Sequence, residues 1–376
     1  MRNGRDFCNI HGFMLLCMKK GKLSMTTRER FIRMHEHKEA DRVPIIDDIW
    51  AGTLARWHAE GMPADVDWRD YFGVDKREMI NFNGTPRYEM KIIEKTERYT
   101  ISTSPWGVTL KQFNELDSTP EFIDFKVTTP EAWEESKARI DVSENRIDWK
   151  SLKENYPRWR AEERWIQGCF SFGFDLTHSH ISGTETVLVA LLTEPEWMLD
   201  MFTTQLDNSI AHFDMLWERG YRPDSIIWYE DMGYKGKPFF STPIYREIIK
   251  PLHKRAVAWA HDHGIYSEMH SCGNIMSHLP DIVDTGLDAL NPIEVKAGMD
   301  VHAIKRDFGK KLVLHGGMDA SRMHEKDKIL PVIEQLLPEL KKDGGYIFSS
   351  DHSVPNAVSL ETYRAIAETA KRYGAY

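Results

Sequence analysis

The feature that most constrains the fold is a repeated alternation of short apolar runs with longer amphipathic segments, beginning near residue 160. The runs are RWIQGCFSF, SIIWYEDMG, IYSEMHSCGN, DALNPIE, KLVLHGGMD and GYIFSSDHS, and an earlier run, RVPIIDDIW, lies at 42–50. Strands that alternate with helices pair in parallel through βαβ crossovers. Because no GxGxxG pattern follows the first run, we predict an α/β fold of the (β/α)8, or TIM, barrel type. Seven strand candidates are visible, and an eighth is not.

Residues 76–160 interrupt this alternation. The stretch KIIEKTERYTISTSPWGVTLKQF alternates polar and apolar residues around Pro105-Trp106-Gly107, which predicts a β-hairpin. The acidic stretch that follows predicts an exposed helix. We therefore predict one domain over residues 25–376, with residues 76–160 as an inserted elaboration.

The N-terminal 24 residues hold an apolar patch, Phe13 to Met18, that is too short for a signal peptide core or a membrane span. Met25 precedes TTRERF, a helix start with Thr26 or Thr27 as the N-cap. We expect residues 1–24 to be a disordered extension.

Composition narrows the class of partner. The chain of 376 residues carries a formal net charge of −9 and has no basic tract, which argues against nucleic acid or an anionic membrane as the main partner. Its four cysteines follow no regular spacing, as expected for a reducing compartment. We predict a cytoplasmic protein that acts on a small molecule.

Polar residues close each apolar run, where a barrel of this kind places its functional groups. They are Asp47 and Asp48, Glu230 and Asp231, His270 and Cys272, Asn291 and Glu294, His315 and Asp319, and Asp351 and His352, with His178 and His180 shortly after the run that contains Cys169. Folding alone does not require strand ends this rich in His, Asp and Glu.

The segment EMHSCGN suggests a metal site. Residues i and i+2 of a strand face the same way, so His270 and Cys272 would both project toward the barrel mouth. Imidazole and thiolate suit Zn²⁺, whereas an isolated His-x-Cys can also be a buried cysteine beside a satisfied histidine. Glu294 and His352 close later runs and can converge on the same mouth. The predicted zinc ligands are therefore His270, Cys272, Glu294 and His352.

Several of these segments resemble the uroporphyrinogen decarboxylase superfamily. They are DSIIWYEDMGYKGKPFFSTPIYREIIKPLHK, HSCGN, GLDALNPIEVKAGMD, LHGGMD and GGYIFSSDHSVP, and TTRERFIRMHEHKEADRVPI resembles the family's N-terminal start. The resemblance covers nearly everything from Met25 onward. Within the superfamily the chain looks like the corrinoid-linked zinc methyltransferase branch, which implies a TIM barrel and methyl transfer.

Two departures from the family pattern bear on the reaction. Decarboxylases of the family follow the first strand with an arginine-rich segment for a polyanionic substrate, whereas this chain has Asp47 and Asp48 there. The methyltransferase branch adds a late cysteine to the His-x-Cys pair, and His352 stands in its place. The resulting ligand set would be formally neutral with Zn²⁺ and the better Lewis acid, which favours removing a methyl group from an O-methyl, possibly aromatic, substrate.

The acceptor implied by the resemblance is the cob(I)amide of a corrinoid. The chain lacks the corrinoid-binding D-x-H-x-x-G pattern, because Lys305 follows Asp300 and His302 where the glycine would stand. The corrinoid must therefore come from a partner protein. Three alternatives remain: transfer from a methylcorrinoid to a thiol, decarboxylation of another acid, and a catalytically silent docking or metal-holding subunit. Methoxylated aromatics, methanol and methylamines all remain as methyl donors.

For the remaining candidate residues the sequence allows either a functional or a purely structural role. Position and family resemblance suggest that Glu230 and Asp231 orient or protonate substrate, and the alternative is helix capping. His178 and His180 would line the pocket or belong to a surface loop. Asp48, Trp50 and Trp228 would contact the substrate, although tryptophans are more often core.

Overall fold

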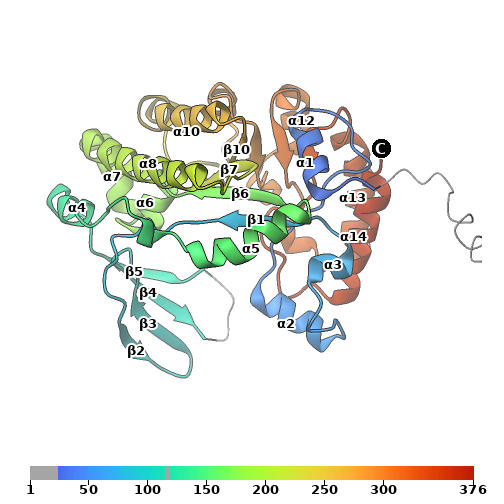
Figure 1. The fold of residues 1–376 in the computed structure, drawn as a ribbon, viewed down its shortest axis with the longest axis horizontal. Coiled ribbons are helices and arrows are strands. Elements are labelled where there is room, and N and C mark those ends of the chain that lie inside the picture. Colours follow the sequence, from blue (N-terminus) through green and yellow to red (C-terminus); the bar gives the residue numbers. More distant parts are fainter. Residues whose placement is uncertain (1–23, 115–118) are drawn as a thin grey trace, which may run out of the picture.

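A computed structural model describes residues 24–114 and 119–376 of the chain. Seven strands form one parallel sheet in the order β1-β6-β7-β10-β11-β12-β13. These strands are β1 Arg77–Ile80, β6 Trp165–Phe170, β7 Ser225–Tyr229, β10 Tyr266–His270, β11 Ala289–Asn291, β12 Val313–His315 and β13 Tyr346–Ile347. The sheet curls, and helices surround it (Figure 1).

The segment at 42–50 closes the sheet into a barrel. On one side the Ile46 amide donates to the Phe348 carbonyl at 3.0 Å, and the Phe348 amide donates to Pro44 at 2.9 Å. On the other side the Asp75 amide donates to the Ile45 carbonyl at 3.0 Å, just before β1. The fold is therefore the predicted (β/α)8 TIM barrel.

The strand that the sequence did not reveal is β1. Its residues, REMI, fall within 76–160, which was predicted to be an insertion from its first residue. The short strand carries Arg77 and Glu78, so it shows no apolar run. The insertion itself begins after β1.

The helices follow the alternation expected of the barrel. The α-helices are α1 Thr27–His35, α2 Ala51–Ala59, α3 Trp68–Phe72, α4 Pro130–Lys137, α5 Trp149–Ala161, α6 Phe174–His180, α7 Thr184–Thr193, α8 Pro195–Glu218, α9 Thr242–Ile244, α10 Lys250–Asp262, α11 Leu279–Val283, α12 Val301–Phe308, α13 Lys326–Leu340 and α14 Leu360–Gly374. Short 3-10 turns lie at η1 Glu144–Arg146, η3 Val295–Ala297 and η4 Ala320–Arg322, and η2 Tyr245–Ile249 is a π-turn. Across the two described ranges, every helix is too short or too polar to cross a lipid bilayer.

The insertion contains the predicted hairpin as part of a larger sheet. Strands β2 Ile92–Lys95, β3 Tyr99–Thr103, β4 Val108–Phe113 and β5 Glu121–Phe125 form an antiparallel sheet, which lies beside the barrel (Figure 1). The turn between β3 and β4 contains Pro105, Trp106 and Gly107, as predicted. A separate small hairpin, β8 Gly233–Tyr234 with β9 Lys237–Pro238, follows β7.

Helix α1 covers the end of the barrel where the strands begin. Its cap is Thr26, whose side chain accepts from the Glu29 amide while Glu29 reaches back to the Thr26 amide. The helix buries Phe31 and Met34 against the first residues of the strands, including Trp165. The rest of this buried cluster is Ile46, Ala289, Val313 and Ile347. The prediction for residues 1–24 concerns residues outside the described ranges, apart from Ser24.

Candidate active site

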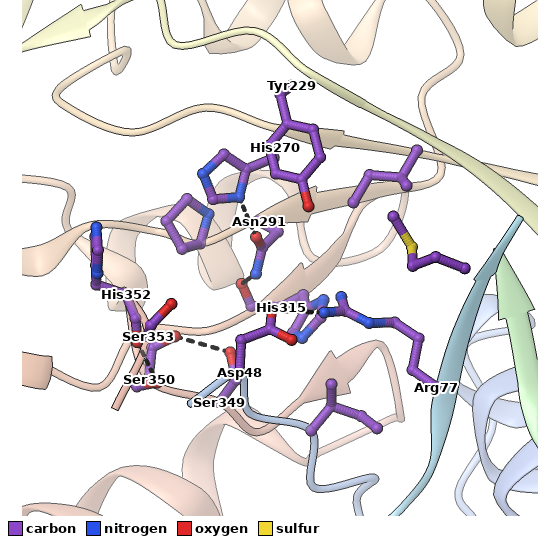
Figure 2. A pocket seen from close by; sticks show the side chains of 14 residues that line it. Asp48, Arg77, Tyr229, His270, Asn291, His315, Ser349, Ser350, His352 and Ser353 are labelled. Carbon is purple, nitrogen blue, oxygen red and sulfur yellow. Dashed lines mark hydrogen bonds and ion pairs between the residues drawn. The ribbon is translucent and has the colours of Figure 1, made fainter. Parts of the chain in front are cut away.

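A cavity of about 380 Å³ lies inside the barrel toward the carboxyl ends of the strands (Figure 2). Its lining residues are Ile46, Asp48, Arg77, Met79, Ile227, Tyr229, His270, Asn291, Pro292, His315, Ser349, Ser350, His352 and Ser353. The predicted residues Asp48, His270 and His352 thus share one cavity. Period-2 alternation explains several of the others, since Ile227 and Tyr229 of β7 face the same way.

Asp231, His270 and Cys272 form the one group of potential metal ligands found among the described residues. One ligand atom from each lies within 4.8 Å of the other two. His270 Nε2 is 3.3 Å from Cys272 Sγ and 3.7 Å from Asp231 Oδ1. Carboxylate, imidazole and thiolate are all ligands that Zn²⁺ takes.

Asn291 fixes the orientation of the His270 ring. The Asn291 side-chain nitrogen donates to the His315 carbonyl at 3.3 Å, so its Oδ1 is the atom that lies 2.5 Å from His270 Nδ1. Nδ1 must then carry the proton, and Nε2 presents a lone pair toward Cys272 and Asp231. A second partner of this kind orients most metal-binding histidines.

Two glycines place Cys272 beside Asp231. Gly273 has φ +80°, and a Cβ on it would lie 2.1 Å from the carbonyl carbon of Gly233. This close approach lets the Gly233 amide donate to the Cys272 carbonyl at 3.1 Å. The Cys272 amide in turn donates to Asp231 Oδ1 at 2.7 Å. The strand β10 ends at His270, so this loop geometry, rather than strand alternation, brings the thiol to the imidazole.

The electrostatics of the group favour a cation. Burial and the carboxylates of Asp231 and Glu294 raise the pKa of the Cys272 thiol. A thiolate in this place would have two carboxylates as neighbours and needs positive charge to be stable. The donor set therefore fits a divalent metal ion.

Comparison with known proteins agrees with this architecture. Residues 173–373 match the family profile described as uroporphyrinogen decarboxylase (URO-D). The chain belongs to the URO-D family. No curated protein sequence matches the chain. Among solved structures, a methyltransferase from Methanosarcina mazei superposes with a TM-score of 0.65 at 15% sequence identity, covering 94% of this chain and all 100% of that one.

The other two predicted metal ligands of this URO-D family member lie near the group but outside it. Glu294 accepts from the Gly273 amide at 2.5 Å and lines a second hollow together with Cys272 and Lys296. His352 lines the main cavity and stacks against Trp50, with ring centroids 5.9 Å apart. Asp231, predicted to orient or protonate the substrate, is the residue that joins His270 and Cys272.

Glu230 and Trp228 face away from the cavity of this URO-D barrel. Glu230 is fully buried, and its Oε1 accepts from the Phe174 amide at 3.0 Å and lies 3.5 Å from His253. Trp228 is buried against Phe172 and the same His253. Neither residue lines the cavity, whereas Tyr229, which lies between them in the chain, faces it.

His178 and His180 belong to α6, outside the cavity lining. His178 stacks on Phe174 at 4.5 Å and lies 3.5 Å from Asp175. His180 meets Phe122 of the insertion edge to face at 5.7 Å, and burial lowers its pKa. These contacts tie α6 to its surroundings and give neither histidine a place in the cavity.

Sequence reasoning missed a polar layer beneath the mouth. The carboxylate of Glu268, fully buried, lies 2.6 Å from His315 Nδ1 and accepts from Gln167 at 2.6 Å. Burial opposes its charge, but His315 and the charge of Arg77 together outweigh burial, and the pKa of Glu268 falls to about 2. The signal was present, since Glu268 precedes His270 by two residues and must face the same way.

Arg77 and Tyr229 complete this layer. Arg77 Nη2 donates to Asp48 Oδ2 at 2.6 Å, and the guanidinium holds the pKa of Asp48 below its usual value. Burial raises the pKa of Tyr229 to about 12, so its phenol is neutral at physiological pH. Charged groups inside a barrel cost desolvation energy, which suggests that this layer serves a ligand.

Proposed function

We propose that the chain is a zinc-dependent methyltransferase that takes a methyl group from an O-methyl substrate and passes it to the cob(I)amide of a partner corrinoid protein. The observation that carries the proposal is the Asp231, His270 and Cys272 group beside a closed-ended cavity. Family membership and the likeness to a solved methyltransferase structure support methyl transfer.

Asp231, His270 and Cys272 would hold the zinc ion. Two anionic ligands and one neutral imidazole would leave the site formally neutral with Zn²⁺, the same balance that the sequence suggested with a different carboxylate. When bound, zinc would supply a Lewis acid that draws electron density from the ether oxygen. Asn291 would keep the His270 ring oriented, and Asp231 would hold the Cys272 loop through its amide.

The group lies between two openings. His270 lines the main cavity, while Cys272 lines the second hollow, of about 380 Å³, with Glu294 and Lys296. We assign the main cavity to the methylated substrate and the outer side to the acceptor. In the transfer, the methyl C–O bond would break as an electron pair of the acceptor forms the new bond to the methyl carbon, and the departing oxygen would gain a proton from solvent or substrate.

Zinc content and corrinoid dependence test this proposal. Elemental analysis of the purified protein should give one zinc per chain, and Asp231→Asn, His270→Ala and Cys272→Ala should each lose it. Cys169→Ala is the matched control, because the Cys169 sulfur on β6 lies 3.8 Å from the Phe170 carbonyl and outside the metal group. Parallel measurements on Glu294→Gln and His352→Ala show whether either also binds the metal.

Methyl transfer is followed in the visible spectrum of a reduced corrinoid protein, where formation of methyl-Co(III) is expected only with the chain and an O-methyl substrate together. The chain alone should turn over nothing. Robust turnover without any corrinoid, or full activity after zinc is removed, would overturn the proposal.

A further inference from the structure

The cavity has polar residues at two places. His270 of the metal group lies at one, and Asp48 and Arg77, here called the Asp48–Arg77 pole, lie at the other. Figure 2 shows Arg77 reaching in from β1, on the opposite side of the cavity from His352, with Asp48 beside it. Arg77 exposes 10% of its side chain, and Asp48, although inside the barrel, exposes 68%. The surface that Asp48 exposes faces the cavity and an adjoining hollow that Trp68 and Arg69 also line.

Both residues of this pole keep hydrogen-bonding capacity. Arg77 donates to Oδ2 of Asp48, which occupies one of the roughly four positions at which a carboxylate can accept. The guanidinium of Arg77 carries about five N–H donors, so its bond to Asp48 leaves others to be used. A ligand can therefore find an acceptor and a donor side by side.

The charge of the pole selects against an anionic ligand. Asp48 and Arg77 neutralise each other, and the nearby Glu268 carboxylate is paired with His315 at 2.6 Å, so this part of the cavity offers no excess positive charge. A ligand carboxylate at Arg77 would lie beside the Asp48 carboxylate and lose the benefit of the guanidinium. A neutral group that both donates and accepts, which is a hydroxyl, fits the pair.

The size and walls of the cavity describe the rest of the ligand. At roughly 30 Å³ per water-sized group, a volume of about 380 Å³ accommodates on the order of ten non-hydrogen atoms. Methanol or methylamine would leave most of this space unfilled. The walls include Ile46, Met79, Ile227 and Pro292 beside the Tyr229 ring, which suits a flat apolar body.

We propose that Asp48 and Arg77 are specificity-determining residues that bind an uncharged hydroxyl group of the substrate, away from its methyl ether. This inference rests on the proposed function for the identity of the ether. The substrate class is then a hydroxylated methyl ether with an apolar body, and methoxylated carboxylic acids are excluded.

Direct binding tests this inference without requiring turnover. Calorimetric titration of the zinc-loaded protein compares 3-methoxyphenol, methoxybenzene, 3-methoxybenzoate and methanol. The phenol should bind about tenfold or more tightly than methoxybenzene, since one hydrogen bond to a charged group is worth about 1.5–3 kcal/mol. The benzoate and methanol should bind more weakly than the phenol.

The variant Asp48→Asn makes the test specific. It leaves the Arg77 charge unbalanced, so the preference should move toward 3-methoxybenzoate by tenfold or more, while affinity for methoxybenzene changes little. Asp327→Asn, an equal charge loss on the exposed side of α13, is the control and should move none of the affinities. Zinc content and melting temperature of each variant show whether the fold and the metal site are intact.

Two outcomes overturn the inference: tighter binding of the benzoate than of the phenol by the natural protein, or an equal loss for every ligand in Asp48→Asn. The proposed function fails differently. If the phenol is preferred but no methyl-Co(III) forms from it, the binding pole stands and methyl transfer does not. If methyl transfer proceeds equally well without a hydroxyl group, the proposed methyl transfer stands and the hydroxyl-binding role of Asp48 and Arg77 does not.

Discussion

At the scale of single residues, Asn291 decides how His270 can bind a metal ion. Its Oδ1 accepts a hydrogen bond from Nδ1 of His270, so only Nε2 of the ring is left to face the sulfur of Cys272. Without that partner the imidazole can rotate and take either tautomer. In the proposed zinc site, the role of Asn291 would thus be to orient His270.

Asn291→Ala should therefore weaken zinc binding by about 10–100-fold, the usual effect of losing such an orienting partner. Asn291→Asp retains an acceptor for Nδ1–H and should recover much of the affinity. Competition with a chromogenic chelator measures both. Equal zinc affinity in the natural protein and Asn291→Ala would show that the ring is held by something else.

Asp41 links Met25, just before α1, to Arg30 within α1. Arg30 donates to both of its carboxylate oxygens, at 2.7 and 2.8 Å, and the Met25 amide donates at 3.0 Å. Partial burial opposes the charge of Asp41, but Arg30 and the backbone amides of Met25 and Arg42 together outweigh burial and lower the pKa to about 2. The ionised form is thus favoured by folding.

Asp41→Asn should cost roughly 2 kcal/mol of stability at pH 7, as a pKa lowered by nearly two units implies. Because the folded-state pKa is depressed, this contribution is present above the unfolded value and is lost as pH falls toward about 2. Denaturant titrations at pH 7 and near pH 2.5 should show the gap between variant and natural protein shrinking. A constant gap would contradict the ion pair.

At the scale of elements, the loop after β10 and the hairpin after β7 are held together through glycine backbones. The Asn274 amide donates to the Tyr234 carbonyl at 3.0 Å, next to the Gly233 and Cys272 hydrogen bond. This contact leaves no room for a side chain on Gly273. The metal group therefore depends on two loops keeping their separation.

Gly273→Ala should separate them, reduce zinc affinity by tenfold or more and lower stability by more than its backbone cost. Gly236→Ala is a matched control. Gly236 lies in the β8–β9 hairpin that Gly273 contacts, has φ +87°, and a Cβ added there would meet no atom within 4 Å. Gly236→Ala should show only the cost of a left-handed alanine, about 1 kcal/mol, and keep its zinc. Similar zinc affinities in the two variants would refute the close-approach argument.

Sequence reasoning recovered the barrel strands that form clear apolar runs and missed β1, which does not. Six barrel strands and the segment at 42–50 appear as apolar runs, whereas β1 carries Arg77 for the cavity and loses its apolar signal. Strand alternation would have favoured Tyr229 over Trp228 and separated Glu230 from Asp231. The proximity of Asp231 to Cys272 could not be foreseen, because it depends on two loops packing through glycines that lie far apart in the sequence.

At the scale of the whole molecule, the apolar core is independent of the metal group. The main cluster of buried residues runs through the helices and the outward faces of the strands, and a second cluster closes the N-terminal end of the barrel. Asp231, His270 and Cys272 lie at the other end. We therefore expect the barrel to fold without a metal at this site.

Zinc removal should therefore leave the fold intact. After treatment with a chelator, far-UV circular dichroism should be unchanged and unfolding should stay cooperative, with a melting temperature lower by roughly 10 °C or less. The decrease reflects the loss of a ligand that binds only the folded state. Collapse of the cooperative transition on chelation would mean that the metal is part of the core.

The cluster beneath α1 has one more consequence. Phe31, Met34 and Trp165 fill the end of the barrel where the strands begin, so among the described residues the cavity is reached from the carboxyl ends of the strands. A partner protein bound over the barrel mouth would close this entrance. Binding would then be ordered: the substrate would have to bind before the partner. The demethylated product could leave only after the partner dissociates. Steady-state rates should then fall at high partner concentration, and raising the substrate concentration should relieve that inhibition.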